Sequence, residues 1–194
     1  MTHTIHPVEF YEIQPEDKLV FLAGPIRGAN NWRDRAIELL SGGDNPENLV
    51  FASPNRINGR KIYTSGHEDF VTRQRQWELY YLRKAVEKSK EGKWTVLFWL
   101  EEQSIPLWED DGIQKKAFWA ITHMELGQIM TAHLDSIVAG IHPDYKERST
   151  LINDLQQSKY LDLAVPFDQK ALSDIIVSNT LEDVCTRTRV LLKL

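Results

Sequence analysis

The sequence predicts a single α/β domain built on a parallel β-sheet of about five strands with helices on both faces. Short apolar runs without polar alternation recur along the chain, which is typical of strands buried on both faces. Stretches with helical spacing of apolar residues separate these runs, so strands and helices alternate as they do in parallel sheets. The chain has 194 residues, 42% of them hydrophobic, and this is enough for one sizeable core.

The first half of the alternation is the clearest. Residues 19–23 (LVFLA) are a short apolar run that a Gly-Pro pair ends. A helix is expected over residues 32–40, because two asparagines just before it offer an N-cap side chain to the first turn. Residues 49–52 are a second, weaker strand, and a polar stretch rich in turn-forming residues follows it.

The second half repeats the pattern around the strongest strand. A long helix is expected at residues 70–89, and residues 94–100 form the longest apolar run. After a loop come a helix ending near residue 133 and a strand at residues 136–141. Beyond residue 144 the pattern is less regular, and it indicates a short helix, a fifth strand near residues 161–165 and a C-terminal helix from about residue 181.

Composition and charge exclude several classes of protein. With 23 basic and 28 acidic residues the net charge is −5, so no basic field draws the chain to nucleic acid or an anionic membrane. The longest apolar run has seven residues, whereas a membrane span needs about 20. Residues 1–18 lack the pattern of a secretory signal, and the single cysteine, Cys185, excludes an internal disulfide. We therefore expect an intracellular, cytoplasmic protein.

Two glutamates lie on apolar helical stripes. Glu78 is in the middle of the apolar side of the helix at 70–89, and Glu125 is at the centre of a stripe in the later helix. A carboxylate facing the interior is costly unless it is paired or neutral, so two of them beside the strongest strand predict a shared pocket. Such a pair can cleave a glycosidic bond, one attacking the anomeric carbon and the other, with a raised pKa, protonating the leaving group.

Each glutamate also has a structural interpretation. Glu78 can pair with Arg75 one turn earlier, and Glu125 can close a capping box if the helix begins at Thr122. Gly127 costs roughly 1 kcal/mol relative to alanine inside a helix. It either lets a ligand or a neighbouring backbone come close or has a neutral packing role.

The segment from Gly24 to Gly28 is a second candidate for ligand binding. Its glycines permit free N–H groups, and the following helix N-terminus favours anions. Arg27 could hold a phosphate or a carboxylate through its fork of donors. The segment matches neither the P-loop nor the dinucleotide G-x-G-x-x-G motif. An ordinary turn with a solvated arginine is the alternative.

Other chemistry is not indicated. The six histidines show no metal-ligand spacing, and no G-x-S-x-G motif is present, so neither a metal site nor a serine or cysteine nucleophile is expected. Trp32, Trp77 and Trp99 fall near the carboxyl ends of the predicted strands, where ligands bind in such sheets. They could stack on a nucleobase there, and core packing is the alternative for at least one of them.

Several motifs along residues 19–145 together carry a family resemblance. In chain order they are Val20-Phe21-Leu22-Ala23-Gly24-Pro25, Trp32-Arg33, Trp77-Glu78, Phe98-Trp99-Leu100, Thr122-x-x-Glu125-Leu126-Gly127 and His142-Pro143-Asp144-Tyr145. This combination resembles the nucleoside 2-deoxyribosyltransferase superfamily, most of all its nucleoside 2-deoxyribosyltransferase-like branch. The resemblance does not cover the extension at residues 1–18 or the C-terminal part at residues 146–194.

The resemblance implies a flavodoxin-like doubly wound sheet, a reaction without cofactor or metal, and a homo-oligomer with the site near a subunit interface. Glu125 would attack C1′ of a deoxyribose, and Glu78 would serve proton transfer to the base. The substrate would be a small molecule, a deoxynucleoside or deoxynucleotide with a nucleobase as acceptor. The resemblance implies that Gly24, Pro25 and Arg27 line the sugar or phosphate end and that Thr122 and Met124 flank the nucleophile. Together with Trp32 and Trp77, which could stack on the base, these are the predicted substrate-binding residues.

Two departures from the family bear on the reaction. Many of the smaller deoxyribosyltransferases carry an aspartate six residues before the nucleophile, where this chain has Trp119, and the tail here is longer. Both favour cleavage over base exchange. The Gly24–Gly28 loop also resembles that of the 2′-deoxynucleoside 5′-monophosphate N-hydrolases, which is the second hypothesis. A catalytically silent nucleotide-binding sensor and a scaffold without activity are the alternatives outside enzymes.

Overall fold

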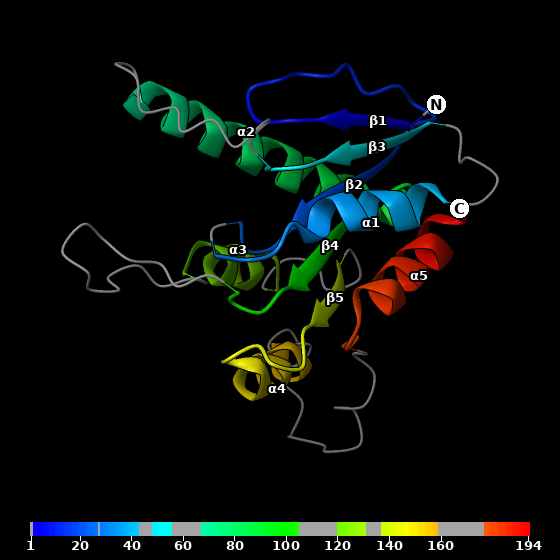
Figure 1. The fold of residues 1–194 in the computed structure, drawn as a ribbon. Coiled ribbons are helices and arrows are strands. Elements are labelled where there is room, and N and C mark those ends of the chain that lie inside the picture. The colour runs from blue at the N-terminus through cyan, green and yellow to red at the C-terminus, as the bar shows by residue number, and fades with distance from the viewer. Residues whose placement is uncertain are drawn as a thin grey trace.

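The computed structural model describes residues 2–26, 28–42, 48–55, 67–104, 120–130, 137–158 and 177–194. Its centre is a five-stranded sheet in the order β1-β3-β2-β4-β5, and every pairing is parallel (Figure 1). The strands are β1 (Thr2–Ile5), β2 (Lys18–Ala23), β3 (Leu49–Ala52), β4 (Trp94–Leu100) and β5 (Ile137–Ile141). The helical elements are α1 (Trp32–Ser41), α2 (His67–Lys88), η2 (Ser89–Glu91), α3 (Ala120–Met130), α4 (Arg148–Ser158) and α5 (Leu181–Leu192).

The predicted α/β fold with a parallel sheet is confirmed, and helices pack on both faces of the sheet. The chain runs outward from β2 to β3, then crosses back over β2 to β4 and β5. The direction of winding therefore reverses between β2 and β4, and in doubly wound sheets ligands bind outside the strand ends at such a reversal. Residues following β2 and β4 are in the position where a site is expected.

β1 is the element that sequence analysis did not predict. The strand lies inside the segment interpreted as an N-terminal extension, and it adds to the outer edge of β3 with Thr2 opposite Leu49 and Ile5 opposite Ala52. Its sequence, THTI, is short and mostly polar, and only Ile5 is buried. A short edge strand with one buried apolar residue has no continuous apolar run, so the criterion that found the inner strands could not find it.

Among the residues that the structure describes, one further pairing extends the opposite edge of the sheet. Gly140 of β5 forms an isolated parallel bridge with Ser178, with Ser178 N–H donating to Ala139 O at 3.1 Å and Ile141 N–H donating to Ser178 O at 2.9 Å. The fifth strand that the sequence predicts at residues 161–165 lies outside the described residues.

Two apolar layers, one on each face of the sheet, form the core. All seven residues of β4 are buried, which explains why its sequence reads as an uninterrupted apolar run. Its side chains alternate, so Phe98 joins the layer that includes Trp77 of α2 and Leu126 of α3. Trp99 joins the other layer, which includes Leu40 of α1 and residues of α5.

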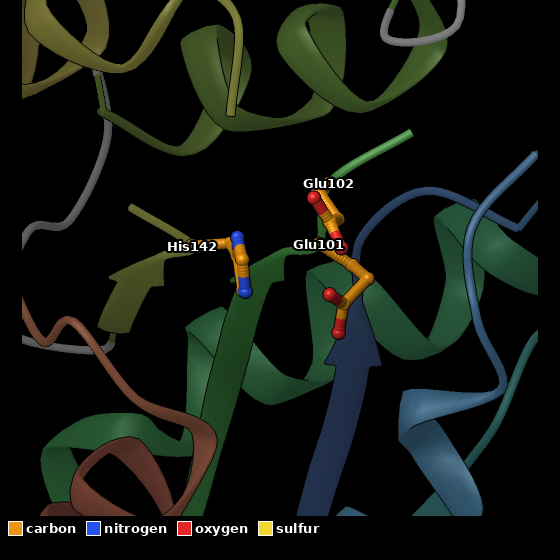
Figure 2. A group of neighbouring side chains, drawn as sticks. All are labelled: Glu101, Glu102 and His142. Atoms are coloured by element: carbon orange, nitrogen blue, oxygen red, sulfur yellow. The ribbon is translucent and has the colours of Figure 1, made fainter. Parts of the chain in front are cut away.

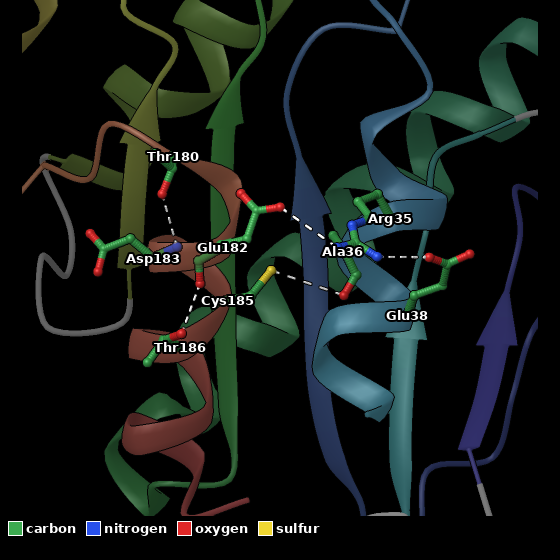
Figure 3. Close-up of polar contacts among 8 residues, drawn as sticks. All are labelled: Arg35, Ala36, Glu38, Thr180, Glu182, Asp183, Cys185 and Thr186. Carbon is green, nitrogen blue, oxygen red and sulfur yellow. Dashed lines mark hydrogen bonds and ion pairs between the residues drawn. The ribbon is translucent and has the colours of Figure 1, made fainter. Parts of the chain in front are cut away.

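α5 is fastened to α1 across the second layer. The Thr180 side chain caps α5 by accepting a hydrogen bond from Asp183 N–H at 3.2 Å (Figure 3). Glu182 Oε1 lies 3.8 Å from Arg35 Nη2 of α1, and the buried Cys185 thiol faces the carbonyl oxygen of Ala36, also in α1.

In the part of the chain that the structure describes, no helix is long and apolar enough to span a membrane.

Candidate functional site

The carboxyl ends of β2 and β4 meet at Gly24. A Cβ atom added to this glycine would lie 2.2 Å from Trp99 O and 2.7 Å from Trp32 Cζ2, far inside normal contact distances. The chain can therefore leave β2 between these two tryptophans only because residue 24 has no side chain. The loop is tied to the chain after β4, since Ser104 N–H donates to Gly28 O at 2.8 Å.

Arg33, in the first turn of α1, holds this loop from inside. Its guanidinium donates to Leu22 O at 3.1 Å, to Gly24 O at 2.5 Å and to Pro25 O at 3.1 Å. The side chain is buried, and this burial lowers the pKa of Arg33 to about 9, while the charges of Glu125 and Glu78 oppose that shift. These carboxylates therefore act electrostatically on the group that shapes the β2 loop.

Arg33 belongs to the Trp32-Arg33 motif, but no role was predicted for it from the sequence. A signal was present, because Arg33 shares the buried side of α1 with Trp32, Ala36 and Leu40. A charged residue on a buried helical face needs several partners, and the carbonyl groups that follow a strand end can provide them.

Glu78 and Glu125, which the sequence predicts to share one site, converge on Arg75. Arg75 Nη1 lies 3.1 Å from Glu78 Oε2 and also forms a close ion pair with Glu125 Oε1. The two glutamate side chains are only 11% and 9% exposed, and that of Arg75 is 27% exposed. Gln74 adds a hydrogen bond to Glu78 Oε1 at 2.9 Å. One cation thus bridges two buried carboxylates from two helices.

Of the two structural interpretations predicted for the glutamates, an ion pair for Glu78 and a capping box for Glu125, the structure shows the first. The Arg75–Glu78 ion pair exists, as the spacing of one helical turn suggested, but the same nitrogen also reaches α3. A capping box beginning at Thr122 does not match the helix, because α3 already includes Ala120. Glu125 is instead engaged with Arg75.

Burial and the ion pair with Arg75 shift the pKa of Glu125 in opposite directions. Burial raises the pKa of Glu125, the ion pair and hydrogen bond with Arg75 lower it, and the nearby charge of Glu78 raises it, with a net upward shift. The pKa of Arg75 is raised as well, because the two carboxylates outweigh the effect of its own partial burial. The charges of Arg75, Glu78 and Glu125 therefore influence one another.

The other predicted site residues lie in different environments. Thr122 is buried beside Glu125 in α3, Met124 is 49% exposed, and a Cβ on Gly127 would meet no atom within 4 Å. Trp77 is fully buried, and its indole donates to Glu9 O at 2.7 Å. Trp32 is buried with its indole donating to Pro25 O at 3.2 Å, while Arg27 lies outside the described residues.

A second group of polar side chains follows β4 and β5. Figure 2 shows Glu101, Glu102 and His142, whose ligand atoms (one from each residue) all lie within 4.8 Å of one another. Within the described ranges, this is the group of histidine, cysteine and carboxylate side chains with the geometry to hold a metal ion. None of these three residues was predicted from the sequence to be a ligand.

Comparisons with known proteins add no assignment. No protein-family model matches the chain, and no curated protein matches it. The five-stranded parallel sheet is compatible with the superfamily that the motifs resemble, but it is not specific to it. Any function must therefore be argued from the side chains.

Proposed function

We propose that this protein cleaves the N-glycosidic bond of a 2′-deoxynucleoside and transfers the deoxyribosyl group to another nucleobase or to water. The observation that carries the proposal is the convergence of two buried carboxylates, Glu78 and Glu125, on one guanidinium. The resemblance of the motifs around these residues to deoxyribosyltransferases supports the same chemistry. Neither residue depends on a cofactor for this role.

The arrangement is compatible with a covalent route. Glu78 Oε2 and Glu125 Oε1 contact the same nitrogen of Arg75, so these two oxygens are separated by no more than roughly 6 Å, twice an ordinary charge-assisted contact. Enzymes that retain configuration through a glycosyl-enzyme place their carboxyls about 5–5.5 Å apart. Two carboxylates this close can act on one glycosidic bond as nucleophile and acid.

In the proposed reaction Glu125 is the nucleophile. Arg75 engages Glu125 Oε1, so Oε2 is the atom that attacks C1′. As the new C1′–O bond forms, the C1′–N bond breaks, its electron pair passes to the base, and Glu78, in the role of general acid, donates a proton to that base. A second base or water then attacks C1′, Glu78 accepts its proton, and the Glu125 carboxylate is released.

The protonation states constrain these roles. A nucleophile must be ionised, whereas burial raises the pKa of Glu125. Arg75 opposes that shift, and we propose that its function in the site is to keep Glu125 ionised and oriented. Loss of Arg75 would then move the acidic limb of the pH–rate profile to higher pH.

Base release is the test of the proposed activity. Purified protein is incubated with each deoxynucleoside and each deoxynucleoside 5′-monophosphate, with and without adenine or cytosine as acceptor, and free base is measured by chromatography. We expect release that is lost in Glu125→Ala and retained in Glu91→Ala, whose side chain is exposed and paired with Lys88. Acceptor dependence identifies a transferase, and its absence identifies a hydrolase.

Two results would contradict the proposal. One is release that continues unchanged in the folded Glu125→Ala protein. The other is no release from any substrate by folded wild-type protein, which would favour the nucleotide-binding sensor if a nucleotide still raised the melting temperature. We also propose that the protein acts as a homo-oligomer, and light scattering during size-exclusion chromatography measures this directly.

A further inference from the structure

The register of the sheet brings Glu101 and His142 together. β4 and β5 pair in parallel with Leu100 opposite Ile141, so the next residue of each strand leaves the sheet beside the other. His142 N–H donates to Leu100 O at 2.9 Å and continues the pairing by one step. Glu102 follows directly and adds a second carboxylate (Figure 2). The cluster is therefore a consequence of backbone pairing.

Trp99 orients two members of this cluster. Its indole N–H donates to Glu101 Oε2 at 2.8 Å, and its ring stands edge-on to His142 with centroids 6.3 Å apart at 82°. The ring itself is confined, because a Cβ on Gly140 would lie 2.9 Å from its atoms. Metal ligands in proteins are commonly held by hydrogen bonds of this kind from neighbouring side chains.

The two carboxylates of the cluster, Glu101 and Glu102, favour the binding of a cation. Glu101 is only 9% exposed, and Glu102 brings a second negative charge next to it. Among the ion pairs formed between described residues, none joins a lysine or arginine to either carboxylate. Carboxylates gathered at a buried strand end are stabilised when a positive charge lies between them.

We propose that Glu101, Glu102 and His142 bind a divalent transition-metal ion of the Zn²⁺ or Mn²⁺ class. Two carboxylates and one imidazole are a mixed oxygen and nitrogen donor set, which suits these ions, whereas Mg²⁺ and Ca²⁺ favour oxygen ligands alone. Three protein ligands leave open positions for water or for a bound molecule. Asp144 lies beside the His142 ring, with its backbone N–H donating to His142 Nδ1 at 3.2 Å and its Oδ2 lying 4.0 Å from the same nitrogen.

This metal site is independent of the proposed glycosidic reaction. Glu101 is held by Trp99, which packs in the layer with α1 and α5. Glu78 and Glu125 belong to α2 and α3, whose residues Trp77 and Leu126 pack in the layer on the other face. The metal proposal can therefore be correct even if base release is never observed.

Calorimetric titration of tag-free, chelator-treated full-length protein with Zn²⁺, Mn²⁺ and Mg²⁺ tests the proposal. We expect one ion per chain, with Zn²⁺ bound more tightly than Mn²⁺ and Mg²⁺ bound most weakly. His142→Ala and Glu102→Gln should each weaken Zn²⁺ binding at least tenfold. Trp99→Phe removes the indole donor but keeps a ring, and it should weaken Zn²⁺ binding by about 10–100-fold.

Matched controls separate this site from nonspecific surface binding. His6→Ala removes a histidine outside the cluster, and Glu87→Gln removes an exposed glutamate of α2, so both should bind Zn²⁺ as the wild type does. Thermal melts check that each variant is folded, and Glu102→Gln keeps the test decisive if Trp99→Phe unfolds. Absence of Zn²⁺ and Mn²⁺ binding, or binding that is unchanged in folded His142→Ala and Glu102→Gln, would overturn the proposal.

Discussion

Replacing Arg75 with methionine removes a cation that joins two buried carboxylates, those of Glu78 and Glu125. Breaking a buried ion pair by deleting one partner costs about 3–5 kcal/mol, because the other charge is left unpaired. The Arg75 side chain is 27% exposed, and partial solvation reduces this cost, so we expect a loss of about 2–3 kcal/mol at pH 7. Methionine retains most of the apolar length of the side chain, so the loss reports on charge more than on packing.

The pH dependence of this loss is the sharper part of the prediction. Burial already raises the pKa of Glu125, and the variant removes the ion pair that opposes the shift. The folded variant therefore binds a proton more readily than its unfolded chain, whose glutamate pKa is about 4.3. Stability then falls as the pH rises from this value through the folded-state pKa, so the deficit relative to wild type grows between about pH 4.5 and pH 7.

Urea unfolding followed by tryptophan fluorescence measures the deficit at both pH values. Arg35→Met is the matched control, because Arg35 bridges Glu38 and Glu182 with its side chain 55% exposed, and a surface pair contributes about 0–1 kcal/mol. The double variant Arg75→Met, Glu125→Gln should recover part of the loss, since removing both partners costs less than removing one. A deficit for Arg75→Met that equals the control, or that does not change with pH, would refute the reasoning.

Three further predictions concern the packing and capping of the fold. Gly24→Ala should destabilise the protein by about 1–3 kcal/mol in thermal melts, because the added Cβ would overlap the backbone oxygen of Trp99. Gly127→Ala, whose Cβ would meet open space, should stabilise the protein by up to about 1 kcal/mol. Equal effects of the two substitutions would contradict the close approach at Gly24. Thr180→Ala should cost about 1 kcal/mol through loss of the α5 cap, and an unchanged unfolding midpoint would show that the cap contributes nothing. Burial raises the pKa of Cys185 to about 12, so iodoacetamide at pH 8 should leave it unmodified by mass spectrometry until urea unfolds the chain, and rapid modification of native protein would be the opposite result.

The inner strands could be predicted because both of their faces are buried. β3 and β4 occupy the predicted ranges, and β2 extends the predicted strand by one residue. β1 could not be predicted, since an edge strand with polar residues on one face lacks a continuous apolar run. What distinguishes it is its pairing with β3, which depends on a part of the chain far away in sequence.

The features of the candidate site that depend on the spacing of residues within a single helix could be predicted. The stripe positions of Glu78 and Glu125 indicated that both carboxylates face the interior, and both are buried. That Arg75 reaches from one helix to the other depends on how α2 and α3 pack, which helical spacing does not encode. The contact between Glu101 and His142 could not be predicted either, because it depends on the register between β4 and β5.

Trapping of a glycosyl-enzyme would show whether Glu125 forms a covalent bond to the sugar. Wild-type protein is mixed with the deoxynucleoside that releases base fastest, quenched in acid within milliseconds to seconds, digested and analysed by mass spectrometry. We expect one added deoxyribosyl group on the peptide that contains Glu125, and no adduct in Glu125→Gln. Base release without any covalent adduct, or an adduct on another residue, would contradict the assignment of Glu125 as the nucleophile.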